Sequence, residues 1–97
     1  MTSPTPVSRA DVFGLSKLLR LQWEDAQGCY VLLYPEGMVK LNGSAGEILR
    51  RVDGKQSVDA ILGDLKQSFP DAPDLDADVM AMLEAASERG WIERKHG

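Results

Sequence analysis

Polar and apolar residues alternate in the first half of the chain, which is the pattern of β-strands buried on one face. In residues 18–23, leucine or tryptophan at every second position predicts a half-buried strand. Residues 29–34 are apolar on both faces, so they predict the central and better covered strand. After turn residues at 35–37, residues 38–41 predict a short third strand. The short connections favour an antiparallel three-stranded sheet, which needs helices over one face.

Apolar residues in the second half recur three and four positions apart, which is the spacing of a helix face. Ser44 and Glu47 predict a capping box that starts the first helix. The apolar face of this helix extends to Val52, and Gly54 supplies a residue that can close the last turn. We therefore expect a helix that begins at Ser44 and joins the sheet to the rest of the domain.

Two more helices follow in this prediction. Ser57 is the expected N-cap of the second helix and Pro70 its stop. Asp74 opens the third helix, Gly90 ends it, and residues 91–92 fold back onto the core. The predicted fold class is α+β, with a three-stranded antiparallel sheet followed by a three-helix bundle in a winged-helix-like arrangement.

The two ends of the chain are predicted to lie outside the domain, which spans residues 17–94. Residues 1–16 are interpreted as a flexible N-terminal arm on compositional grounds, and residues 95–97 as a charged tail. The apolar residues of the arm that could bind a surface are Val12, Phe13 and Leu15. Instead of being flexible, the arm could dock through these residues on the domain itself or on a second copy of it, and the sequence leaves this choice open.

Composition restricts the classes of function. A chain of 97 residues fits one domain with one core. Its net charge of −4, with scattered Lys and Arg, argues against nucleic-acid binding. The single Cys29 excludes an intramolecular disulfide and a cysteine-cluster metal site. Residues 1–7 do not resemble a secretion signal and no apolar run reaches membrane length, so we expect a cytoplasmic protein without a membrane partner.

Few residues are candidates for chemistry. His96 is the only histidine and stands next to the C-terminus, whereas Cys29 lies in an apolar strand pattern and is interpreted as core. Asp74, Asp76 and Asp78 suit the start of a helix better than a metal site. The glycines do not match a phosphate-binding spacing. We therefore predict no catalytic residue, no metal and no cofactor.

The edge of the third predicted strand is the strongest candidate for a binding site. If the three strands pair in chain order, the outer edge of residues 38–41 has unpaired backbone groups. Such an edge can accept an extended peptide as an added strand. DNA binding is disfavoured, because the third helix begins with aspartates and has no Lys or Arg before Arg89.

A specific series of segments resembles a known family. Tyr-Pro-Glu-Gly-Met-Val-Lys-Leu-Asn at 34–42 is followed by Ser-Ala-Gly-Glu-Ile-Leu at 44–49 and by Asp-Gly at 53–54. With Leu-Arg-Leu-Gln-Trp at 19–23 and Ser-Val at 57–58, this series resembles the PqqD family of pyrroloquinoline quinone (PQQ) biosynthesis. The resemblance covers roughly residues 18–92. It departs from the family pattern at Val52, where cysteine is common, and at Gly43 and Gly46.

The resemblance implies a non-catalytic peptide chaperone, also called a RiPP recognition element. Such a protein binds the leader of the ribosomally made precursor PqqA and presents it to the radical S-adenosylmethionine enzyme PqqE. The leader is expected to add as a strand beside the third strand and against the third helix. The matching positions in this chain are Met38, Val39, Lys40 and Leu41 on the strand, with Val79, Met82 and Leu83 on the helix.

Two other functions are kept as alternatives. A protein that binds PQQ or a quinone intermediate would need a pocket with polar anchors. A DNA-binding regulator would bind with a steep salt dependence. Whether the protein is a monomer or a homodimer is left open by the sequence.

Overall fold

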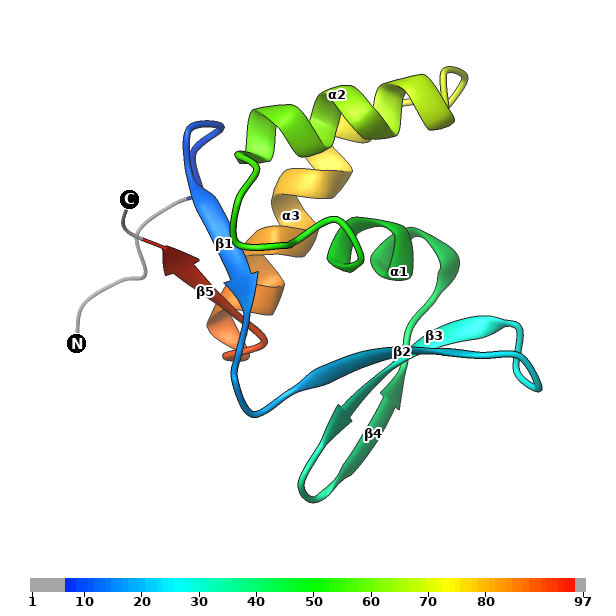
Figure 1. Ribbon diagram of the computed structural model, residues 1–97. Coiled ribbons are helices and arrows are strands. Elements are labelled where there is room, and N and C mark those ends of the chain that lie inside the picture. The colour runs from blue at the N-terminus through cyan, green and yellow to red at the C-terminus, as the bar shows by residue number, and fades with distance from the viewer. Residues whose placement is uncertain (1–6, 96–97) are drawn as a thin grey trace.

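Two small antiparallel sheets and three helices make up the computed structural model of the protein, which describes residues 7–95 (Figure 1). The α+β class is thereby confirmed. In chain order the elements are β1 (Val12–Leu15), β2 (Arg20–Glu24), β3 (Cys29–Tyr34), β4 (Gly37–Lys40), α1 (Gly43–Leu49), α2 (Val58–Ser68), α3 (Leu75–Glu88) and β5 (Ile92–Lys95). The likeness of this arrangement to a winged helix stays a prediction.

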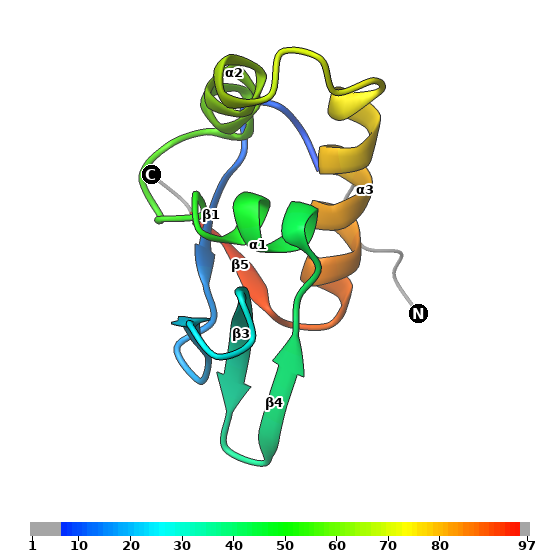
Figure 2. The same ribbon diagram turned by 90° about the vertical axis from the view of Figure 1, so that its right-hand side faces the viewer.

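The predicted three-stranded sheet is present as β2, β3 and β4, with β3 in the centre. Both pairs are antiparallel, with Trp23 opposite Tyr30 and Leu32 opposite Val39. Val31 and Leu32 point to opposite faces of β3, and both are fully inaccessible to solvent. The expectation that this strand is the best covered is therefore confirmed. Figure 2 shows β3 and β4 extending below the helices.

The second sheet was not predicted, and it corrects the interpretation of both chain ends. β1 pairs with β5 in antiparallel register, with Phe13 opposite Arg94. Phe13 is only 1% exposed and belongs to the core. Residues 7–16 are thus docked on their own domain rather than forming a flexible arm, and Lys95 belongs to β5 rather than to a tail. The pairing joins residues about 80 positions apart, which local composition does not reveal. Residues 1–6 and 96–97 lie outside the described residues.

The start of α1 differs from the predicted capping box. Asn42 is the N-cap, because its side-chain oxygen accepts a hydrogen bond from the amide of Ala45 at 2.7 Å. Ser44 donates its hydroxyl to the same oxygen at 3.0 Å instead of capping the helix. The helix ends at Leu49, earlier than expected, and Gly54 has a different role: with φ of +77°, it donates its amide to the carbonyl oxygen of Phe13 at 2.9 Å.

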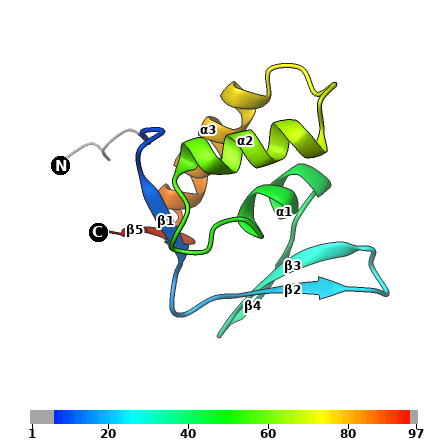
Figure 3. The same cartoon turned by 45° about the horizontal axis from the view of Figure 1, so that its top comes forward.

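The other two helices follow the prediction more closely. Ser57 caps α2, since its hydroxyl oxygen accepts from the amide of Ala60 at 3.2 Å. Asp74 precedes α3 in a left-handed conformation without a side-chain cap, and Asp76 in the first turn forms ion pairs with Arg9 and Lys66. Figure 3 shows α1 between α2 and the three-stranded sheet. No helix within residues 7–95 has the length and apolar character needed to span a membrane.

Candidate functional site

The outer edge of β4 has no strand beside it among the described residues. The amide of Leu41 donates to the carbonyl of Tyr30 at 3.0 Å, and Val39 lies opposite Leu32. Backbone groups of an antiparallel strand alternate between its two sides. Val39 and Leu41 therefore direct their amides and carbonyls toward β3, whereas Met38 and Lys40 direct theirs outward.

The side chains of this strand alternate in the same way. Val39 packs against the core and Leu41 is only 6% exposed, so both hold the strand to the domain. Met38 is 53% exposed and Lys40 is also exposed. The four residues predicted for the strand thus divide into two that hold it and two whose backbone could meet a ligand.

The three residues predicted on the third helix also have different positions. Val79 and Leu83 are fully buried in the core, and Met82 is partly buried. Val79 and Met82 line the pocket described next, but Leu83 does not. The structure therefore brings two of the three predicted helix residues to a cavity and places the third behind them.

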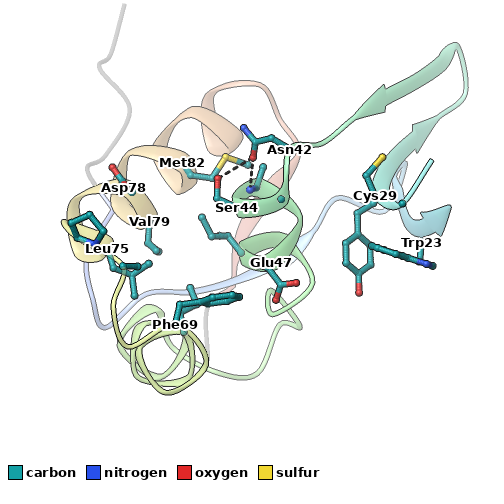
Figure 4. A pocket seen from close by; sticks show the side chains of 18 residues that line it. Trp23, Cys29, Asn42, Ser44, Glu47, Phe69, Leu75, Asp78, Val79 and Met82 are labelled. Atoms are coloured by element: carbon teal, nitrogen blue, oxygen red, sulfur yellow. Dashed lines mark hydrogen bonds between the residues drawn. The ribbon is translucent and has the colours of Figure 1, made fainter. Parts of the chain in front are cut away.

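A pocket of about 740 Å³ lies between the start of α1, the end of α2, the first half of α3 and the turn between β2 and β3. We call it the α1–α3 pocket. Its α3 wall consists of Leu75, Asp78, Val79 and Met82, which are spaced i, i+3, i+4 and i+7 and so lie on one helix face. Figure 4 shows these side chains opposite Ser44 and Glu47 of α1, with Phe69 below them.

The pocket begins where β4 ends. Asn42, Gly43 and Ser44 form part of its rim, and they directly follow Leu41. Met82 lies next to Asn42 and Ser44 in Figure 4. An added Cβ at Gly43 would have no atom within 4 Å, so the rim is open at this position. The edge of β4 and the α1–α3 pocket are therefore neighbouring parts of one surface.

The charged side chains of the pocket are both acidic. They are Glu47 and Asp78, on opposite walls. Arg51, whose side chain is 5% exposed, donates to Glu47 at 2.7 Å and to Asp64 at 2.7 Å. The hydrogen bond from Arg51 holds the pKa of Glu47 below its ordinary value, so this carboxylate is ionised at neutral pH. Asp78, which forms no ion pair among the described residues, disfavours an anionic ligand such as a carboxylated quinone.

A second pocket of about 490 Å³ adjoins the start of β2 and the turn between β3 and β4. Val39 and Trp91 line it, together with Leu18, which is 74% exposed. The two tryptophans are thereby separated, because Trp23 lines the α1–α3 pocket and Trp91 lines the second one.

The residues considered for chemistry occupy structural or peripheral positions. Cys29 is partly exposed at the rim of the α1–α3 pocket, although the sequence suggested core. Asp76 is held by cations and Asp78 faces the pocket, so the three aspartates do not converge. Within residues 7–95, no three histidine, cysteine or carboxylate side chains are grouped to hold a metal ion. His96 lies outside the described residues.

Sequence reasoning missed Asp78 and Leu75 as site residues. It assigned Asp78 to the helix start and did not single out Leu75. A signal for the site was present, since Asp78 interrupts an otherwise apolar face formed with Leu75, Val79 and Met82.

Known proteins share both the sequence and the fold of this chain. The family model described as "Coenzyme PQQ synthesis protein D (PqqD)" matches residues 29–92. A protein named "PqqA binding protein" from Pseudomonas aeruginosa (strain UCBPP-PA14) is 56% identical over 79 residues, covering 81% of this chain and 86% of that protein. The protein of the same name from Azotobacter vinelandii is 53% identical over 83 residues, covering 86% and 90%.

A solved structure extends the comparison to the fold. It is the solution NMR structure of the PqqD truncation of Methylobacterium extorquens PqqCD, described as a functional and stand-alone RiPP recognition element. The TM-score is 0.76 at 32% sequence identity, and the match covers 93% of this chain and 97% of that one.

Proposed function

The chain belongs to the PqqD family, and we propose that it acts in PQQ biosynthesis as a RiPP recognition element that binds the precursor peptide PqqA. Two relatives more than 50% identical to it are named for binding PqqA. The protein has no catalytic role in this proposal. It presents the bound peptide to the radical S-adenosylmethionine enzyme PqqE, and holding the peptide near the enzyme raises its effective concentration there.

The peptide binds as a strand added to β4. The observation that carries this proposal is the outward direction of the Met38 and Lys40 backbone groups on an edge with no neighbouring strand among the described residues. Those groups supply donors and acceptors for an extended peptide. Val39, partly buried against the core, and Leu41, which is buried, are bonded to β3 and keep the strand in place while the peptide binds.

The test is calorimetric titration of the full chain with synthetic PqqA. Lys40→Pro removes one outward amide and leaves the β3 ladder intact, because proline is tolerated on an edge whose amide faces solvent. Lys40→Ala is the matched control, since it removes the same side chain but keeps the amide. We expect Lys40→Pro to weaken binding about fivefold or more relative to Lys40→Ala, from the loss of one backbone hydrogen bond.

The same comparison can be made with Met38→Pro and Met38→Ala. Equal affinities of the proline and alanine variants at both positions would argue against strand addition at β4. Absence of saturable PqqA binding to the wild-type chain, with or without PqqE, would contradict the proposed function as a whole.

A further inference from the structure

The α3 wall of the α1–α3 pocket combines an apolar surface with one exposed carboxylate. Leu75, Val79 and Met82 supply the apolar part, and Asp78 stands on the same helix face. A ligand seated against this wall would meet apolar groups and a negative charge within one or two helix turns. Such a wall fits an apolar side chain that is close to a cation.

Asp78 stands in the first turn of α3, where its negative charge interacts favourably with the helix dipole. Among the described residues, no cation lies within ion-pair distance of it. The other carboxylate of the pocket is in the opposite situation, because Glu47 pairs with both Arg50 at 2.9 Å and Arg51 at 2.7 Å. Asp78 is therefore the group of this pocket that remains available to a positively charged ligand.

The position of the pocket links it to the peptide. Its rim at Asn42–Ser44 begins directly after β4, and Met82 lies beside that rim (Figure 4). A peptide that follows the edge of β4 past Leu41 would reach this rim next. A segment of peptide continuing beyond the added strand would therefore meet the pocket at Asn42–Ser44.

We propose that Asp78 makes the α1–α3 pocket selective for a PqqA segment in which a lysine or arginine neighbours an apolar residue. This segment lies just beyond the part of the peptide that adds to β4, so the inference rests on the proposed function. The apolar residue enters between α1 and α3, and the cation pairs with Asp78 at the rim. β4 then supplies affinity that is independent of side chains, and the pocket supplies discrimination among peptides.

The first test is a double-mutant cycle measured by calorimetry. It combines wild-type protein and Asp78→Asn with synthetic PqqA and a peptide series in which each lysine or arginine is replaced by glutamine. Asp78→Asn should weaken wild-type PqqA binding about two- to fivefold at low salt, as expected for an exposed ion pair. One peptide replacement should lose its own effect in the Asp78→Asn background.

The matched control is Glu84→Gln. Glu84 is exposed on the same helix, lines neither pocket, and its replacement changes the net charge by the same amount. It should leave the affinity for PqqA within about 1.5-fold of wild type, since it only changes long-range screening. Raising the salt concentration should weaken wild type and Glu84→Gln alike, and Asp78→Asn less.

Tryptophan fluorescence provides a second readout that reports where the peptide lies. In a Trp91→Phe variant, Trp23 at the α1–α3 pocket is the sole tryptophan of the chain. Saturating PqqA should shift its emission. In the reciprocal Trp23→Phe variant, the emission of Trp91 should change less, because Trp91 lies at the other pocket.

The outcomes separate this inference from the function on which it rests. If PqqA binds but Asp78→Asn behaves like Glu84→Gln, or no peptide position couples to Asp78, the pocket inference is wrong and the peptide-binding function stands. If Asp78→Asn weakens binding of PqqE and leaves that of PqqA unchanged, the pocket serves the enzyme and the inference is also overturned. If wild-type protein does not bind PqqA, both fail together.

Discussion

The outer edges of β1 and β4, one in each sheet, differ in what lies beside them. In the β1–β5 sheet, the chain also covers the outer side of β1: Val12 bridges to Ser57, and Phe13 accepts a hydrogen bond from Gly54 at 2.9 Å. In the β2–β3–β4 sheet, β4 keeps one side without a strand neighbour among the described residues. The first sheet joins the distant parts of the chain, and the second comes from three consecutive strands.

This difference separates stability from binding. The β1–β5 sheet contributes Phe13 and Ile92 to the core, and their side chains are 1% and 3% exposed. The β2–β3–β4 sheet and the residue that follows it bury Leu32 and Leu41, whereas Met38 at the outer edge of β4 is largely exposed. A buried residue replaced in the β1–β5 sheet should therefore lower the free energy of unfolding. A replacement at the outer edge of β4 should leave that free energy nearly unaltered and change the affinity for the peptide.

Replacing Phe13 by alanine should give the largest loss of stability. Phe13 is buried, and removing a buried aromatic side chain costs about 3–5 kcal/mol. Urea unfolding followed by circular dichroism measures this loss. Met38→Ala, at the outer edge of β4, should have a free energy of unfolding within about 0.5 kcal/mol of that of wild type. A Phe13→Ala variant as stable as Met38→Ala would contradict the proposed contribution of Phe13 and the β1–β5 sheet to stability.

Arg51→Met should have the next largest effect, because it removes a buried guanidinium that joins α1 to α2. Arg51 contacts Glu47 and Asp64, each at 2.7 Å. Hydrogen bonds to charged groups are worth about 1.5–3 kcal/mol, so a loss in this range is expected in urea unfolding. The control is Arg50→Met, whose exposed pair with Glu47 should contribute at most about 1 kcal/mol. Equal losses would show that burial of Arg51 has no energetic consequence.

Asn42→Ala tests the junction between β4 and α1. Loss of this N-cap should lower the free energy of unfolding by about 1 kcal/mol. Ser44→Ala should cost less, since Ser44 donates to Asn42 and not to the helix backbone. Thermal unfolding of the two variants shows which residue caps the helix. A larger loss of stability in Ser44→Ala than in Asn42→Ala would identify Ser44 as the N-cap.

The smallest effect concerns pH. The pKa of Glu47 is lowered in the folded protein, chiefly by Arg51, from an ordinary value of 4.5. Its contribution to stability is therefore complete above that value and is lost as the pH falls through the lower folded pKa. The difference in thermal midpoint between wild type and Glu47→Gln should shrink as the pH falls below 4.5. A difference independent of pH would show that ionisation of Glu47 does not stabilise the fold.

The periodic parts of the fold could be predicted from the sequence because their signals are local. Alternation around Leu21, and the helix faces of α2 and α3, fixed the type of each element within a few residues. β1 and β5 could not be found this way, because each is paired with a strand far along the chain and Phe13 gains its burial from those distant partners. Arg94 and Lys95 have the composition of a solvated tail, yet they form a strand.

The candidate site was only partly accessible for the same reason. The edge strand followed from the strand pattern and the expected strand order, and the helix positions Val79 and Met82 followed from the resemblance. The direction of each amide on β4 depends on the register with β3, which a sequence alone does not specify. Asp78 could be assigned to the pocket only after α1 and α3 had been placed opposite each other, since its position also suits the start of a helix.

The pairing of β1 with β5 determines where another domain could be tethered. Val12 stands directly opposite Lys95, but the chain ahead of Val12 continues to α2 and α3, where Arg9 pairs with Asp59 and Asp76. In Figures 1 and 3 these strands lie on the opposite side of the helices from the turn between β2 and β3, which borders the α1–α3 pocket. A domain attached beyond β5 would therefore leave the entrance of the pocket open, whereas one attached ahead of residue 7 would start from the side of α3 that carries Asp76.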